Sequence, residues 1–196
     1  MVKNSQIKNS TGVLIIEGYN FVNCSSMKLN ESLIRTVPDF PKPGIQFKDI
    51  TPLLKEPEGI KQCLHAMMPD RETKVDVLVG IESRGFILGP LMAQSLNCGF
   101  VPIRKKGKLP HQTLEASYDL EYGSATIEIH RDAIQPGDRV LLHDDVLATG
   151  GTAIAAIKLI EALGGEVVCC SFIIELTELK ARPLIERYPI KVAYQF

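Results

Sequence analysis

Residues 139–152 read RVLLHDDVLATGGT, and this segment gives the clearest indication of the fold. Its apolar run, Val140 to Leu142, is typical of a strand that is buried on both faces of a parallel sheet. After the glycines, residues 153–163 place apolar side chains on one helical face, and Gly164 followed by Gly165 is a typical helix end. The segment therefore predicts a strand, a short turn and a helix, in that order.

The turn between this strand and this helix has the character of an anion site. The first amides of a helix have no partners inside the helix and lie at the positive end of its dipole, and glycine lets the backbone approach a phosphate closely. Asp144 and Asp145 come just before the turn. Their charge repels a phosphate, but carboxylates accept hydrogen bonds from sugar hydroxyls and bind magnesium. The segment therefore predicts a site for a phosphorylated sugar.

Other interpretations of the turn are less favoured. The chain contains neither the G-x-x-x-x-G-K-[ST] motif of a P-loop nor the G-x-G-x-x-G motif of a dinucleotide site. An ordinary strand-to-helix connection is the simplest alternative, and an isolated pair of glycines would favour it. The ordered combination of a strand, an acid pair, a TGGT turn and a helix favours the phosphate site instead.

The same segment resembles the signature with which the type I phosphoribosyltransferases bind 5-phosphoribosyl-1-pyrophosphate (PRPP). Five further segments, in the order in which the family has them, resemble its adenine-specific members. These segments are PDFPKPGI (38–45), FKDITP (47–52), GIESRGF (80–86), RKKGKLP (104–110) and SYDLEYG (117–123). The resemblance runs from about Leu29 to the C-terminus, and chance seldom produces five matching segments in order.

The resemblance implies both a fold and a reaction. The fold is α/β, with a central, mostly parallel sheet flanked by helices, a small N-terminal hood and a flexible catalytic loop. The reaction transfers the 5-phosphoribosyl group from PRPP to adenine and gives AMP and pyrophosphate through an oxocarbenium-like transition state. The resemblance also implies that Mg²⁺ arrives with PRPP rather than on direct protein ligands, and that the protein is a homodimer.

The family's functional residues carry over onto matching positions of this chain. Glu121 matches the glutamate of the mobile loop that handles the purine proton, and the two aspartates hold the ribose. The implied site consists of Glu121, Asp144 and Asp145 for catalysis; Asp144, Asp145, Ala148, Thr149, Gly150, Gly151 and Thr152 for ribose and 5′-phosphate; Ser83, Arg84, Arg104, Lys105 and Lys108 for pyrophosphate; and Gln46, Phe47, Lys48 and Val146 for adenine.

Several of these residues have an ordinary structural interpretation as well. A glutamate in a polar hairpin, such as Glu121, is most often a surface residue, and a basic loop is most often simply solvated. Lys48 stands where many relatives have arginine, and these two cations are not interchangeable at a planar contact. We interpret His143 as a strand residue rather than a catalyst. In this family the loop before the arginine equivalent to Arg84 often contains a non-proline cis peptide bond, and Glu82-Ser83 is the matching position of this chain.

Composition narrows the function classes. The chain has 196 residues, enough for one domain with a substantial core, and its net charge of −1 favours neither nucleic acid nor an anionic membrane. Its five cysteines are odd in number and lack C-x-x-C spacing, so they indicate neither a disulfide framework nor a zinc site. Cys169 and Cys170 are expected on opposite faces of a strand. No apolar run approaches the ~20 residues of a membrane span, and we expect a cytoplasmic protein.

The domain organisation is simple. Residues 1–26 are expected to form an N-terminal extension, either loose or a small hairpin, and residues 27–196 a single domain. Prolines predict an irregular segment over 38–52, and a polar stretch is expected over 104–117. The periodicity elsewhere predicts helices over Leu29–Val37 (capped by Asn30), Glu58–Met68, Phe86–Leu96 and Leu179–Arg187, strands over Val75–Gly80, Phe100–Ile103, Val167–Glu175 and Lys191–Tyr194, and a hairpin of Tyr118–Leu120 with Thr126–His130.

Two other functions are open at this point. Some proteins of this fold sense PRPP as transcriptional regulators, but those carry a DNA-binding module, and the 26-residue extension is too short and not basic enough for one. The other alternative is a phosphoribosyltransferase for another base, such as hypoxanthine, guanine or orotate. The PDFPKPGI and SYDLEYG segments favour adenine.

Overall fold

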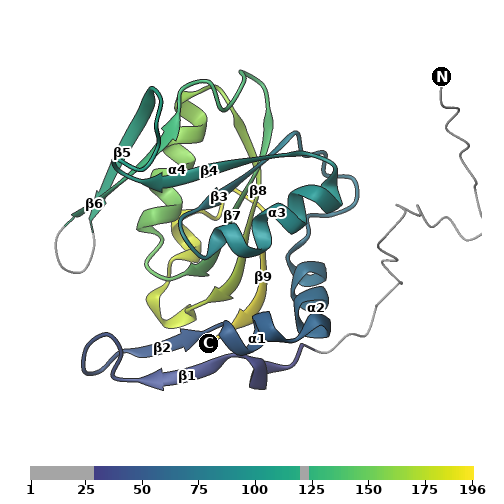
Figure 1. The fold of residues 1–196 in the computed structure, drawn as a ribbon, viewed down its shortest axis with the longest axis vertical. Helices are drawn as coiled ribbons and strands as arrows, with labels where there is room; N and C mark the ends of the chain where they lie inside the picture. Colours follow the sequence, from purple (N-terminus) through teal and green to yellow (C-terminus); the bar gives the residue numbers. More distant parts are fainter. Residues whose placement is uncertain (1–28, 120–123) are drawn as a thin grey trace, which may run out of the picture.

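The computed structural model of the chain describes residues 29–119 and 124–196. Its centre is a seven-stranded sheet with the strand order β5-β6-β4-β3-β7-β8-β9 (Figure 1). The five strands from β4 to β9 in this order run parallel, and β6 and β5 extend the β4 edge in antiparallel pairing. The expected α/β fold with a mostly parallel sheet is therefore confirmed.

The strands of this sheet are numbered in chain order. Their bounds are β3 (Val77–Ile81), β4 (Gly99–Lys105), β5 (Thr113–Asp119), β6 (Ser124–His130), β7 (Arg139–Leu147), β8 (Glu166–Glu175) and β9 (Ile190–Gln195). The α-helices are α1 (Thr51–Lys55), α2 (Pro57–Met67), α3 (Gly85–Leu96) and α4 (Gly151–Ala162). No helix of the described part is long and apolar enough to cross a membrane.

The two faces of the sheet bury separate cores. Helix α4 covers one face, and helices α1, α2 and α3 cover the other, so the sheet lies between two helical layers. Successive strand residues alternate between them: Leu142 packs on the α4 side and Leu141 on the side of α2 and α3. Cys170 and Cys169 divide in the same way, as predicted, and both are free thiols.

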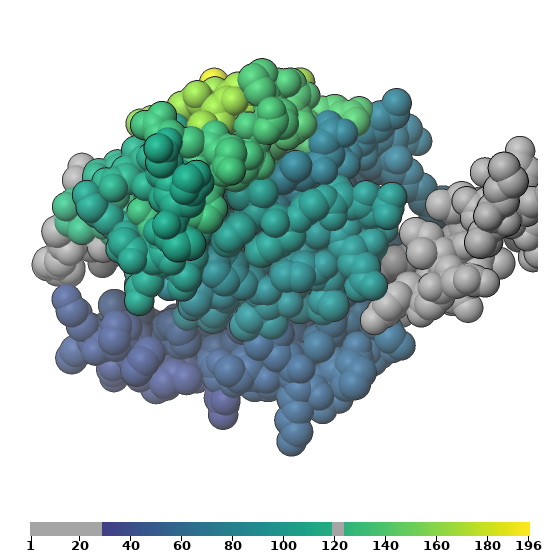
Figure 2. All heavy atoms as spheres, turned by 45° about the horizontal axis from the view of Figure 1, so that its top comes forward, coloured from purple at the N-terminus to yellow at the C-terminus, as the bar shows by residue number. Residues whose placement is uncertain are grey.

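A small hood precedes this core. Strands β1 (Arg35–Pro38) and β2 (Gln46–Asp49) form a separate antiparallel pair, which we call the hood, and α1 follows it directly. In Figure 2 these segments, in purple and blue, form a band along the lower edge of the molecule. The hairpin tip of the hood and the β5–β6 hairpin extend to the same side in both views (Figures 1 and 2).

The predicted helix over Leu29–Val37 is wrong. Only the 3₁₀ turn η1 (Glu31–Leu33) forms there, and the chain then enters β1. The predicted cap is present, since the Asn30 side chain accepts a hydrogen bond from the Ser32 amide at 3.1 Å. The segment over 38–52 is also less irregular than predicted because it contains β2. Pairing between β1 and β2 gives hydrogen-bond partners to the backbone amides and carbonyls of this segment, and the positions of the prolines do not reveal this pairing.

Two further predictions need correction. The polar stretch over 104–117 contains most of β5, whose Leu114, Ala116 and Tyr118 pack against the core while the intervening residues face away. The predicted helix over 179–187 is instead two 3₁₀ turns, η2 (Thr177–Leu179) and η3 (Arg182–Leu184), separated by Lys180 with a φ of +51°. The remaining predicted helices and strands are present, with shifted ends. The turn of the predicted hairpin and residues 1–28 lie outside the described residues.

His143 is fully buried in the middle of β7. Its Nδ1 lies 3.1 Å from the carbonyl oxygen of Ser171 on the neighbouring strand, and its Nε2 has no partner among the described residues. Burial lowers the pKa of His143 from 6.5 to about 4, and the bond to Ser171 only partly offsets this effect. These surroundings agree with its interpretation as a strand residue.

His143 is expected to make the fold sensitive to acid. The unfolded chain protonates this side chain below about pH 6.5, whereas the folded chain does so only near pH 4, so stability is lost as the pH falls through this window. At ~1.4 kcal/mol per pKa unit, the loss by pH 4 amounts to about 3 kcal/mol. Urea unfolding of His143→Leu at pH 7 and pH 4 should show a correspondingly smaller loss than the wild type. His65→Leu, at an exposed position of α2, is the control, and equal losses in the wild type and His143→Leu would contradict the assignment.

Candidate functional site

Two strand-to-helix connections meet at one edge of the sheet. Strands β3 and β7 are parallel neighbours, with Gly80 paired to His143. Residues 82–84 connect β3 to α3, and residues 148–150 connect β7 to α4. Because parallel strands end at the same edge, both connections lie at the carboxyl ends, where α/β sheets bind ligands.

The acid pair lies within β7 rather than after it. The strand continues to Leu147, so Asp144 and Asp145 lie near its carboxyl end. Both residues are largely buried, with 9% and 6% of their surface exposed. Pairing with β8 explains the extra length, because Asp144 and Val146 both have partners on that strand. The strand therefore fixes the backbone of both acids, which a loop would leave freer.

The two acids have different surroundings. Asp145 forms an ion pair with Arg84, whose Nε donates to Oδ2 of the carboxylate. Asp144 instead accepts a hydrogen bond from the amide of Asp145 at 2.8 Å. Burial and the neighbouring charge of Asp145 raise the pKa of Asp144 well above its ordinary value. One acid is thus held by a cation and the other is biased towards its neutral form, which can donate as well as accept a hydrogen bond.

The turn after β7 leads into a helix whose first amides are free. Gly150 has a φ of +85°, and a Cβ on it would lie 3.2 Å from the Cβ of Ala181, so both conformation and space favour glycine. The first bond of α4 joins the Ile154 amide to the Gly150 carbonyl at 2.9 Å, and no side chain caps the helix. The amides before Ile154 can therefore bind an anion.

The segment 104–110, which we call the basic loop, is tied to the end of β3. Its first two residues, Arg104 and Lys105, belong to β4 and pair with β6, so the expectation that they stand in a loop is wrong. The Glu82 carboxylate accepts from Arg104 Nε at 3.0 Å and from the Lys105 amide at 3.1 Å. Burial raises the pKa of Glu82, but these hydrogen bonds outweigh it and the net shift is downward. The peptide between Glu82 and Ser83 is cis, which is the bond that the family resemblance points to. Glu82 thus joins the basic loop to the connection that carries Ser83 and Arg84.

The hood brings an aromatic ring to the same region. The Arg84 guanidinium lies 5.5 Å from the centre of the Phe47 ring, and Phe40 packs edge-on against Phe47 at 5.1 Å. Lys48 is directed elsewhere: its Nζ donates to Thr36 Oγ1 at 3.0 Å and lies 4.0 Å above the Phe196 ring. Arg84 therefore connects the acid pair of β7 to the predicted base segment, whereas Lys48 joins the hood to the C-terminal strand.

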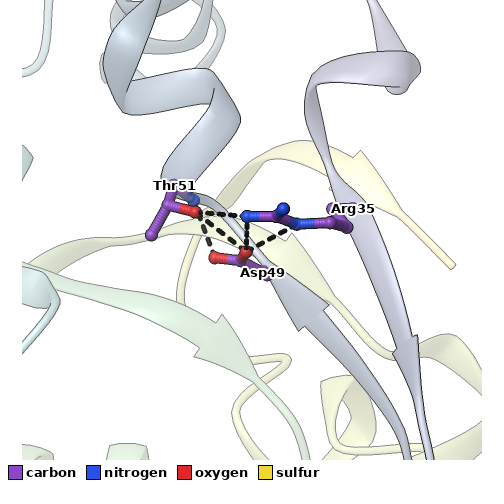
Figure 3. A network of polar contacts seen from close by, with 3 residues as sticks. All are labelled: Arg35, Asp49 and Thr51. Carbon is purple, nitrogen blue, oxygen red and sulfur yellow. Dashed lines mark hydrogen bonds and ion pairs between the residues drawn. The ribbon is translucent and has the colours of Figure 1, made fainter.

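A polar network fixes the hood to α1 (Figure 3). Arg35 donates to Asp49 Oδ2 through Nε at 3.0 Å and Nη2 at 2.7 Å, and Nη2 also reaches Thr51 Oγ1 at 3.0 Å. The other oxygen of Asp49 accepts from the Thr51 amide at 2.9 Å, which is the leading reason that its pKa is lowered. The network thereby holds β1, β2 and the start of α1 in one arrangement.

Several residues that organise this region are not among the predicted site residues. Glu82 and Glu128 bind the basic loop, and Asp49 holds the hood. The sequence does contain signals for Asp49 and Glu128. Asp49-Ile50-Thr51 has the spacing with which an aspartate caps the amide two residues on. Glu128 is a charged residue between two isoleucines in a strand pattern.

Some predicted residues are not placed in this site. Glu121 lies outside the described residues. Val146 is half-buried in β7 and packs on the side of α2 and α3, and Gln46 is exposed in β2. The described ranges contain no group of three or more His, Cys, Asp or Glu side chains that could hold a metal ion.

The chain is similar to known proteins over most of its length. Residues 50–192 match the family model of the phosphoribosyl transferase domain. The adenine phosphoribosyltransferase of Christiangramia forsetii is 53% identical over 161 residues, which cover 82% of this chain and 94% of that protein. That of Halothermothrix orenii is 55% identical over 161 residues, with 82% and 95% covered.

Solved structures give the same result. The crystal structure of adenine phosphoribosyltransferase from Rhodothermus marinus has a TM-score of 0.81 and 59% identity, and the match covers 85% of this chain and 96% of that one. The enzyme from Saccharomyces cerevisiae, complexed with an imino-altritol bisphosphate and adenine, has a TM-score of 0.78 and 39% identity, with 83% and 95% covered.

Proposed function

The chain belongs to the phosphoribosyltransferase family, among the adenine phosphoribosyltransferases, and from this premise we propose how its residues divide the reaction. The protein is an enzyme that transfers the 5-phosphoribosyl group of PRPP to adenine and gives AMP and pyrophosphate. The observation that carries the proposed division is the meeting of the β3 and β7 connections, joined by the pair of Arg84 and Asp145.

We assign the 5′-phosphate to the turn Ala148, Thr149, Gly150, Gly151 and Thr152 and the ribose hydroxyls to the acid pair. The free amides at the start of α4 and the left-handed Gly150 support the first assignment. The burial of Asp144 and Asp145 supports the second, because hydrogen bonds contribute more where water is excluded, and a carboxyl group can accept them in either form. Holding the ribose at both ends orients C1 of the sugar for attack.

We assign the leaving pyrophosphate to Ser83, Arg84, Arg104, Lys105 and Lys108. The glycosidic C–O bond breaks as negative charge grows on this group, so cations fixed in advance lower the barrier. Glu82 supports the assignment because it holds Arg104 and the Lys105 backbone beside Ser83. The side chains of Lys105 and Lys108 are exposed and free to meet the substrate.

We assign adenine to the hood and the end of β7. Phe47 stacks on the purine, Val146 lies on its other face, and the backbone of Gln46 reads its edge. The strand partner of Gln46 is Pro38, which has no amide hydrogen, so the Gln46 carbonyl receives none from it and can accept from the 6-amino group. The Gln46 amide is proposed to donate to N1. A 6-oxo purine has an acceptor at position 6 and a donor at N1, so it would leave both the carbonyl and the amide of Gln46 unpaired. The contacts of Lys48 with Thr36 and Phe196 favour a role in holding the hood.

Glu121 is proposed to handle the purine proton. As N9 of adenine bonds to C1 of the ribose, the base loses one proton, and a carboxylate near N9 accepts it. Closure of the loop over the site would exclude water, which otherwise traps an oxocarbenium-like centre. Mg²⁺ is proposed to enter with PRPP and to neutralise part of the charge on its phosphates. No direct protein ligand to the ion is proposed, because Asp144 and Asp145 are assigned to the ribose hydroxyls and Asp145 already pairs with Arg84.

A homodimer stays a prediction from the family resemblance, and a cytoplasmic location stays one from the composition. The relatives do not support a PRPP-sensing regulator or a transferase for another base. Those that this chain matches over more than nine-tenths of their length are adenine phosphoribosyltransferases.

A base panel tests the substrate directly. The protein is incubated with PRPP and Mg²⁺, and adenine, hypoxanthine, guanine and orotate are offered in turn. Adenine should be converted with kcat/KM at least ~100-fold above the others, because the site's hydrogen-bond pattern leaves the wrong base with unpaired groups. Conversion of a 6-oxo purine or of orotate at a comparable rate would contradict the adenine assignment.

Replacement of Glu121 tests the catalytic assignment. Glu121→Gln removes the proton acceptor but keeps the shape of the side chain, so kcat should fall by roughly 10²–10⁴. The dissociation constant for PRPP, measured by titration calorimetry, should change little, because the carboxylate does not touch the phosphates in this scheme. Turnover near the wild-type rate would remove Glu121 from the mechanism.

A further inference from the structure

Glu128 is a buried acid on the outward face of the sheet. Its neighbours Ile127 and Ile129 point into the core on the α4 side, so the alternation of β6 directs Glu128 the other way. An outward-facing strand residue is ordinarily solvated, but Glu128 is only 3% exposed. The basic loop makes backbone hydrogen bonds to its carboxylate. A charged side chain placed in this way needs strong partners, because burial disfavours the ionised form.

The partners of Glu128 are backbone amides of the basic loop. Oε1 accepts from the Lys108 amide at 2.9 Å and from the Leu109 amide at 2.8 Å. Burial raises the pKa of Glu128, but hydrogen bonds from these amides, from the Gly107 amide and from the Thr113 hydroxyl outweigh it, and the net shift is downward. Consecutive amides that converge on one anion form a nest, and here the anion is supplied by the protein itself.

The backbone of Lys108 in the basic loop is held from two sides. Lys108 donates its amide to Glu128, and its carbonyl accepts from Arg104 Nη1 at 3.1 Å. Arg104 is the strand partner of Glu128 between β4 and β6, so both side chains come from one row across the sheet. Any change in the loop backbone at Lys108 therefore moves the Arg104 guanidinium as well.

We propose that Glu128 is a positioning residue for pyrophosphate recognition: its carboxylate fixes the loop backbone at Lys108 and Leu109, and thereby the positions of the Lys108 and Arg104 side chains. This inference rests on the proposed assignment of these two cations to pyrophosphate. Glu128 does not touch the substrate and acts through the loop. Its loss should therefore weaken binding of pyrophosphate and leave binding of AMP unchanged, because AMP contacts the turn of β7 and the hood instead.

Substitutions of graded severity separate positioning from general stability. Glu128→Leu keeps the approximate size but removes every acceptor, and pyrophosphate binding in the presence of Mg²⁺ should weaken about tenfold or more. Glu128→Gln keeps one carbonyl oxygen for the amides of Lys108 and Leu109, so it should restore part of the affinity. Glu166 provides the control, since it is also a strand glutamate, but it is exposed and lies at the amino end of β8, away from the basic loop. Glu166→Leu and Glu166→Gln should bind pyrophosphate as the wild type does.

Titration calorimetry with magnesium pyrophosphate and, separately, with AMP decides the matter, with circular dichroism as the check on folding. A selective loss of pyrophosphate affinity in Glu128→Leu, smaller in Glu128→Gln, supports the inference. Unchanged pyrophosphate affinity, or an equal loss for both ligands, overturns it. If Glu128→Leu does not fold, Glu128→Gln carries the same test with a smaller expected loss of ~2- to 5-fold, because its amide oxygen still accepts from the Lys108 and Leu109 amides. A wild-type protein that converts adenine while Glu128→Leu binds pyrophosphate normally refutes the positioning role alone, whereas a wild type that converts no adenine refutes the proposed function.

Discussion

Parallel pairing of β3 with β7 is the constraint on which the site depends. The pairing brings two strand-to-helix connections to one edge of the sheet, although about 60 residues separate them in the chain. It sets the Arg84 guanidinium against the Asp145 carboxylate, and Arg84 also lies near Phe47 of the hood. One guanidinium thus links the segments proposed for ribose, pyrophosphate and base. The two buried cores on either side of the sheet hold these connections in register.

The charges of the site are organised by carboxylates that carry no substrate in this scheme. Glu82 holds Arg104 and the Lys105 amide, Glu128 holds the amides of Lys108 and Leu109, and Asp49 holds the hood through Arg35. A loop of exposed cations would otherwise repel itself and sample many conformations. Internal anions reduce that freedom before the substrate arrives, which is the condition for electrostatic stabilisation of a leaving group.

Much of this could be predicted from the sequence, and the exceptions have physical reasons. The strand, turn and helix around Asp144 were predictable because an apolar run, a glycine turn and a helical face follow one another within one segment. The length of β7 was not, because Asp144 belongs to the strand only through its pairing with β8. The sequence predicts a helix where the hood strand β1 forms, because its partner β2 follows several prolines and the pairing of the two strands is not visible in the sequence. Glu128 was missed because its burial depends on a loop that folds back over the sheet, a contact that periodicity does not encode.

A crystal structure of the protein with AMP tests the central claim most directly. The account predicts that the phosphate oxygens lie at hydrogen-bond distance, about 2.7–3.2 Å, from amides of the turn 148–152, with the ribose hydroxyls on Asp144 and Asp145. The purine should then lie against Phe47. A phosphate held by Arg104, Lys105 and Lys108, or a ribose that contacts neither aspartate, would contradict it.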